Sequence, residues 1–166
     1  MKFFFISISI FSVLAFSRFI PHPPNFTNLI ALSCYVPLIL GVKFIPVLIL
    51  CFALTDIIIG YHTGTFFTWG SVFLIGLLSI YFGKNLSIRI SGVLLGALVF
   101  FIVTNFGVWA SGMYGYTLSG LINCFILAIP FFGYSLVSTL IYATIIETLL
   151  RFSFLKKLLS KKLVKL

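Results

Sequence analysis

Long apolar runs follow one another along nearly the whole chain, with short polar connections between them. Continuous apolar runs of roughly 20 residues are typical of transmembrane helices, whereas the strands of a membrane barrel alternate apolar and polar residues. A helix also bonds its own backbone N–H and C=O groups, as hydrocarbon requires. The pattern predicts an all-α polytopic membrane protein with about six transmembrane helices. The predicted spans are residues 3–20, 27–42, 44–60, 67–82, 88–108 and 131–150.

The apolar segment at residues 117–130 is only fourteen residues long, which is short for a span. It predicts a short re-entrant or interfacial helix before the last span, and a seventh span is the alternative. Basic residues in short loops are usually found on the cytoplasmic side of the membrane. Six spans place both the basic loops and the basic C-terminus on that side, whereas seven spans with a cytoplasmic C-terminus would place the basic loops outside. We therefore expect six spans in a bacterial inner (plasma) membrane, with both termini cytoplasmic. The inner basic residues are then Lys2, Lys43, Lys84 and Arg89.

The first span has two interpretations. Lys2, the apolar run after it and the small residues Ala15 and Ser17 resemble a secretory signal peptide. A retained first helix is the interpretation that we favour, and cleavage would leave the other spans unchanged.

Composition agrees with the apolar pattern, since 61% of the 166 residues are hydrophobic and only 8% are charged. Six spans leave no room for a soluble domain, so we expect a transmembrane domain at residues 1–150 and a basic cytoplasmic tail at 151–166. The formal charge of +9 does not indicate nucleic-acid binding, because six of the eleven basic residues lie in that tail. A basic segment beside a span contacts anionic lipid headgroups of the bilayer.

Polar and aromatic residues gather at the predicted outer ends of the spans. An apolar, aromatic cavity with a few polar groups is what a small-molecule site requires, so this cluster predicts a site for a small-molecule substrate. Trp109 and Tyr114 have a simpler explanation as part of an aromatic belt at the membrane interface. Arg18 and Asp56 have a simpler explanation as a structural ion pair. The candidate substrate-binding residues are Arg18, His22, Asn25, Phe26, Asp56, His62, Asn105, Trp109 and Tyr114.

Signals for catalysis, cofactors and metals are weak. The sequence has no phosphate-binding loop, nucleophile elbow or zinc-protease motif, and it has only two acidic residues. We therefore expect neither an enzyme nor a cofactor. His22 and His62 with Asp56 form too sparse a set to predict a metal site. The three cysteines lie in apolar segments and are interpreted as small core residues.

Two features of the later spans indicate packing. Glu147 precedes Arg151 by four residues, which predicts a structural ion pair on one helix face. Gly92 and Gly96 are also four apart, a spacing that is typical of close contact between helices.

The outer segments resemble an uncharacterised family of small bacterial membrane proteins described as candidate transport proteins. The resemblance covers most of the chain before the tail. It is carried by Arg18, by the Pro-His-Pro-Pro-Asn-Phe-Thr run at residues 21–27, and by residues 56–62, 104–109, 113–114 and 128–132.

More distantly, the layout is similar to the S components of energy-coupling-factor vitamin transporters. Those are six-helix proteins with an external site, and a short apolar segment and Pro-Phe precede their last helix, here residues 121–132. The first helix of S components often carries small residues four positions apart, which contact the coupling subunit. In this chain the small residues of the first span, Ser9, Ser12 and Ala15, are three positions apart, so the sequence departs from that pattern. The resemblance implies a partner, either an energising ATPase module or another membrane subunit.

These observations predict a membrane transport protein that binds a small organic solute, such as a vitamin-like nutrient, at its external face. The alternative is a structural or assembly subunit of a membrane complex, such as the cell-shape machinery, with no substrate.

Overall fold

The computed structural model describes residues 2–83 and 85–152, and within these it contains six α-helices and no strand. Four of them are long and apolar enough to cross a membrane, counting η1 with α3, whereas α2 and α4 are shorter apolar helices. The predicted all-α polytopic membrane fold is confirmed. The helices are α1 (Lys2–Phe19), α2 (Leu29–Leu40), α3 (Ile45–Ile59), α4 (Thr65–Leu78), α5 (Leu86–Ala110) and α6 (Leu118–Arg151), with 3₁₀ turns η1 (Val42–Phe44) before α3 and η2 (Ser79–Tyr81) after α4.

Helix α2 lies at the centre of the molecule and is its most buried element. Every residue from Leu29 to Pro37 is buried, because α3, α4, α5 and α6 all pack against this helix. Twelve helical residues rise only about 18 Å, against a hydrocarbon core of about 30 Å. If α2 lies within the membrane, part of the connection that leads into it lies at membrane depth as well. Irregular backbone at that depth is stable only where it is buried in protein or lines a cavity.

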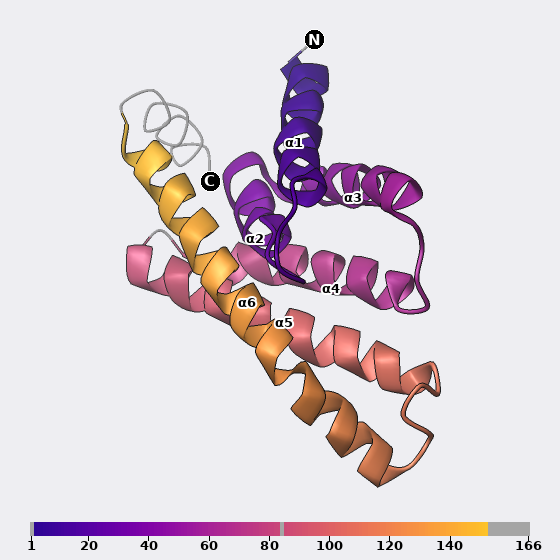
Figure 1. The fold of residues 1–166 in the computed structure, drawn as a ribbon. Helices are drawn as coiled ribbons and strands as arrows, with labels where there is room; N and C mark the ends of the chain where they lie inside the picture. The colour runs from indigo at the N-terminus through magenta and orange to yellow at the C-terminus, as the bar shows by residue number, and fades with distance from the viewer. Residues whose placement is uncertain (1, 84, 153–166) are drawn as a thin grey trace.

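The remaining helices form two groups around α2. Helix α1 packs mainly on α3, while α4, α5 and α6 pack on one another in chain order. Figure 1 shows α1 standing at a steep angle to α3, and α4 and α5 running side by side in opposite directions.

The last helix corrects one prediction. Residues 117–130 do not form a short separate helix or a seventh span, because α6 runs without interruption from Leu118 to Arg151. Pro130 lies inside it. Proline removes one backbone hydrogen bond and bends a helix, but neighbouring helices in a membrane allow the helix to continue beyond it. A proline and a short apolar run therefore resembled a helix boundary in the sequence.

Glycines allow the close helix packing that the sequence predicts on α5. A side chain at Gly96 would meet Cys34 of α2 and Ile75 of α4, and one at Gly92 would collide with the ring of Phe82. The three cysteines are buried and free, as small core residues. The predicted basic tail from residue 153 onward, and Lys84, lie outside the described residues.

Candidate solute-binding site

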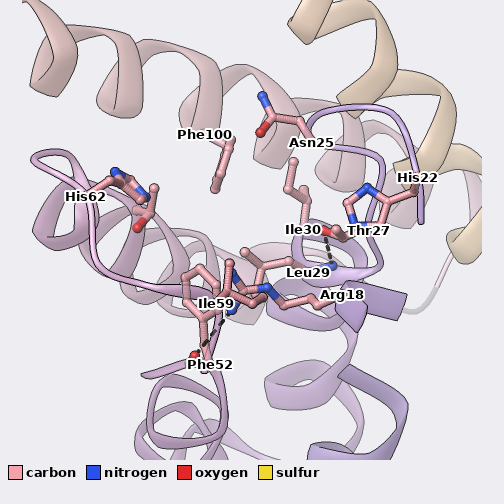
Figure 2. A pocket seen from close by; sticks show the side chains of 11 residues that line it. Arg18, His22, Asn25, Thr27, Leu29, Ile30, Phe52, Ile59, His62 and Phe100 are labelled. Atoms are coloured by element: carbon pink, nitrogen blue, oxygen red, sulfur yellow. Dashed lines mark hydrogen bonds between the residues drawn. The ribbon is translucent and has the colours of Figure 1, made fainter. Parts of the chain in front are cut away.

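A cavity of about 220 Å³ lies between the α1–α3 pair and the group of α2, α4 and α5. Figure 2 shows His62 on one side and His22 on the other, with Phe100 pointing in between them from α5. The polar residues that line the cavity are Arg18, His22, Asn25, Thr27, His62 and Thr68. The apolar residues that line it are Leu29, Ile30, Phe52, Ile59 and Phe100.

The α1–α2 connection holds His22 and Asn25 at the cavity through a tight turn. The Phe26 N–H donates to the Pro23 carbonyl over 3.0 Å, and Asn25 has a positive φ of 62°. Proline in the second place and a left-handed residue in the third are the requirements of a type II turn, which Pro24 and Asn25 fulfil. Nδ1 of His22 lies 2.7 Å from the same Pro23 oxygen, so the turn also orients the imidazole.

The α3–α4 connection fixes His62 in a comparable way. Helix α3 ends at Gly60, whose φ of 108° favours glycine. The His62 N–H donates to Oγ1 of Thr65, the first residue of α4, and the Thr65 hydroxyl donates back to the His62 carbonyl at 2.8 Å. The Gly64 N–H donates to Nδ1 of His62 at 3.1 Å. The ring is therefore held by the backbone that begins α4.

An ion pair joins α1 to α3 beside the cavity, and its arginine, Arg18, lines the cavity. A guanidinium nitrogen of Arg18 lies 2.6 Å from Oδ1 of Asp56, which confirms the predicted pairing of these two residues. The same guanidinium donates to the Thr55 hydroxyl and to the Phe52 carbonyl, and its centre lies 4.4 Å from the Phe52 ring. Trp69 of α4 donates from its indole to Oδ2 of Asp56 at 2.7 Å. Both oxygens of this buried carboxylate are therefore bonded.

The structure brings four of the nine predicted site residues together at the cavity, namely Arg18, His22, Asn25 and His62, with Asp56 bonded to Arg18 behind them. Phe26 belongs to the same turn as Asn25 but is not among the lining residues. The other three predicted residues, Asn105, Trp109 and Tyr114, lie at the α5–α6 end.

That second cluster makes contacts within the protein. The Asn105 amide donates to the Phe101 carbonyl of its own helix at 2.7 Å. The Trp109 indole donates to the Thr117 carbonyl at 3.2 Å, and its ring packs against Phe106 and Tyr116. Tyr114 is half-buried in the turn before α6. The Trp109 contacts connect α5 to the start of α6, and none of the three residues lines the cavity.

Sequence reasoning missed several residues of the cavity as individual candidates. Thr27 lies in the polar loop at residues 21–27, and the candidates chosen from that loop were His22, Asn25 and Phe26. Thr68 and Phe100 lie inside apolar helices, where one hydroxyl or one ring carries no distinctive signal. Trp69 was missed for the same reason, although its indole needs a hydrogen-bond partner when it lies inside a bundle. Within the described residues, no three His, Cys, Asp or Glu side chains come together as a metal site.

The comparison with protein families comes to one result: a family described as "Family of unknown function (DUF6580)" matches residues 1–161. The chain belongs to this family. No curated protein and no solved structure matches it. The predicted resemblance to an uncharacterised family is thus confirmed. The description of this family says nothing about transport or about S components.

This member of the family has a second ion pair, which corrects the prediction that Glu147 pairs with Arg151. Nε of Arg89 donates to Oε1 of Glu147 at 2.6 Å and its terminal nitrogen donates to Oε2 at 2.7 Å. The Tyr35 hydroxyl of α2 donates to Oε1 at 2.7 Å. Arg151, one turn further along at the end of α6, is exposed, and within the described residues Glu147 forms its ion pair with Arg89.

Proposed function

We propose that this protein is a membrane transport protein that captures a small organic solute, such as a vitamin-like nutrient, in the cavity between its two helix groups. Charged residues in an apolar bundle are costly and usually serve a pathway or a site. The observation that carries the proposal is the convergence of Arg18, His22, Asn25 and His62 on one cavity from α1 and two separate loops.

The proposal includes an orientation. With both termini on the cytoplasmic side of a bacterial inner membrane, the two loops that bear the histidines face outward, and the solute enters from outside. The basic loops and tail favour this orientation. Release inward then requires a partner, such as the ATPase module that the resemblance to S components implies, or movement of the α1–α3 pair against the other helices.

The second candidate is a structural subunit without a substrate. The contacts of Trp109 and Asn105 favour it, because Trp109 joins α5 to the start of α6, Asn105 bonds its own helix, and neither side chain lines the cavity. The cavity volume is also below the roughly 300–1,000 Å³ of most ligand pockets. A structural subunit would need no convergence of polar loops on a cavity, and for that reason we place transport first.

Thermal unfolding of the purified protein in mild detergent tests the proposal, with and without an extract of growth medium. A solute at a hundred times its dissociation constant should stabilise the folded state by about 2.7 kcal/mol. Asn25→Ala should abolish this stabilisation with little loss of folded yield, because Asn25 is an exposed loop residue whose amide faces the cavity. Asparagine and alanine differ in their tolerance of a positive φ, so Asn25→Gly serves as the matched variant that keeps the turn.

The outcomes separate the two candidates. Stabilisation of the wild type that both Asn25 variants lose supports solute binding at the cavity. If no extract stabilises the wild type and no small molecule copurifies with it, the structural subunit is the better explanation.

A further inference from the structure

The backbone fixes the ring proton of each cavity histidine in a different place. Nδ1 of His62 accepts the Gly64 N–H at 3.1 Å, so in the neutral ring the proton lies on Nε2. Nδ1 of His22 lies 2.7 Å from the Pro23 carbonyl oxygen, which can only accept. Here Nδ1 carries the proton and Nε2 carries a lone pair. His62 therefore offers a hydrogen-bond donor, and His22 offers an acceptor.

These complementary groups lie on opposite sides of the cavity (Figure 2). The Asn25 amide, which can donate and accept, reaches the same space from the loop of His22. The Thr68 hydroxyl donates to the Thr65 carbonyl at 2.7 Å, which leaves its oxygen as an acceptor. A solute that matches this lining has both donors and acceptors on its rim.

The lining carries no net charge in the neutral form of the histidines. Arg18 is the one charged side chain that lines the cavity in the described part of the chain, and Asp56 balances it at 2.6 Å. An anion beside Arg18 would also lie close to the Asp56 carboxylate, and a cation would meet the guanidinium. Because Asp56 already balances Arg18, the lining offers no free charge that would attract an ionised solute, and the site favours an uncharged one.

Two aromatic rings complete the walls. Phe100 is directed into the cavity from α5, and Phe52 lies under the Arg18 guanidinium on the α3 side. The Arg18 guanidinium covers one face of the Phe52 ring, so Phe100 is the ring that a flat solute can contact, and a branched aliphatic solute would not gain a stacking contact there. The volume of about 220 Å³ limits the solute to a small ring system.

We infer that the solute is a small, uncharged, planar nitrogen heterocycle that carries both N–H donors and carbonyl or ring-nitrogen acceptors. This inference rests on the proposed function, because it names the class of solute for the same cavity.

Fractionation of the growth-medium extract tests the charge and the planarity. The extract is passed at neutral pH over a strong anion exchanger and a strong cation exchanger, and each fraction is added to the wild-type protein before thermal unfolding. We expect the stabilising activity in the flow-through, together with near-ultraviolet absorbance in the solute that is released from washed, heated protein. Stabilisation by a retained fraction, or a solute without such absorbance, overturns the inference but leaves transport standing. If neither the whole extract nor any fraction stabilises the protein, the proposed function fails instead.

Variants of His62 test its assigned proton with the same flow-through. His62→Asn keeps an acceptor for the Gly64 N–H but lacks the Nε2–H donor, so the apparent affinity should fall roughly threefold to tenfold. His62→Gln places an amide N–H near the Nε2 position and should recover part of that loss. Thr63→Ala, at an exposed neighbour in the same loop, is the matched control and should bind as the wild type does. Wild-type affinity in His62→Asn with a normal melting temperature would overturn the donor role of His62.

Discussion

The two ion pairs use the same chemistry in different parts of the helix bundle, yet their surroundings differ. The chain has only two acidic residues, and each pairs with an arginine of another helix at 2.6 Å. At the α5–α6 pair, Glu147 binds Arg89 through both oxygens and also accepts from the buried Tyr35. At the α1–α3 pair, Arg18 faces a cavity and donates to groups of α3 besides Asp56.

This difference separates an ion pair that closes a core from one that borders a site. The Arg89–Glu147–Tyr35 network joins α5, α6 and the central α2, and none of its three residues lines the cavity described above. The Arg18–Asp56 pair joins α1 to α3, and Trp69 connects its carboxylate to α4. A bidentate pair with a third partner has little freedom to rearrange. The Arg18–Asp56 pair is held as firmly, since its carboxylate also bonds Trp69 and its side chains are only 14% and 4% exposed, and it differs in that Arg18 lines the cavity.

Breaking the α5–α6 pair should have the largest effect on stability. Glu147→Gln leaves the Arg89 guanidinium without its counter-charge, and removing one partner of a buried pair typically lowers the free energy of unfolding by about 3–5 kcal/mol. Unfolding of the purified protein in mixed micelles, followed by tryptophan fluorescence, measures the loss.

Arg151→Gln is the matched control for the partner that the sequence suggested. Arg151 is exposed, so this change should alter the free energy of unfolding by less than about 0.5 kcal/mol. Equal losses for Glu147→Gln and Arg151→Gln would restore the ion pair along α6 and contradict the one between α5 and α6.

A double-mutant cycle at the cavity pair should give a smaller effect. Asp56→Asn and Arg18→Gln should each lower the free energy of unfolding, and the double change should lower it by less than the sum of the two. We expect a coupling energy of about 0.5–3 kcal/mol. Trp69 can still donate to the remaining amide oxygen in Asp56→Asn, which limits the loss. Strictly additive losses would mean that the two residues act independently.

Helix positions, apart from the start of α6, and the Arg18–Asp56 ion pair followed from local pattern in the sequence. Apolar runs located all six helices, because hydrocarbon selects for continuous helical segments. Arg18 and Asp56 were paired correctly, since isolated charges in an apolar bundle need a partner. Pairing of Glu147 failed because spacing along one helix reveals only neighbours on that helix, whereas Arg89 lies 58 positions earlier and meets it only in the packed bundle.

The candidate site was predicted only in part, for a related reason. The loop prolines and histidines are visible in the sequence as breaks in the apolar pattern, so His22, Asn25 and His62 were found. Trp109 and Asn105 were assigned to the same site because the sequence predicts them at the same depth in the membrane. Depth alone does not tell which helices lie next to each other in the plane of the membrane. Trp109 bonds Thr117 at the start of α6, and Asn105 bonds Phe101 of its own helix.

The smallest effect should come from the third member of the buried network. Tyr35→Phe removes one hydrogen bond to Glu147 and keeps both bonds from Arg89, so the free energy of unfolding should fall by about 1 kcal/mol. Tyr134→Phe, at an exposed tyrosine of α6, is the matched control and should change it by less than about 0.5 kcal/mol. Solute binding should be unchanged in both variants, because Tyr35 does not line the cavity. Should Tyr35→Phe destabilise the protein as much as Glu147→Gln, the tyrosine and not Arg89 would be the main partner of that carboxylate, and the contrast between the two ion pairs would rest on a hydroxyl group.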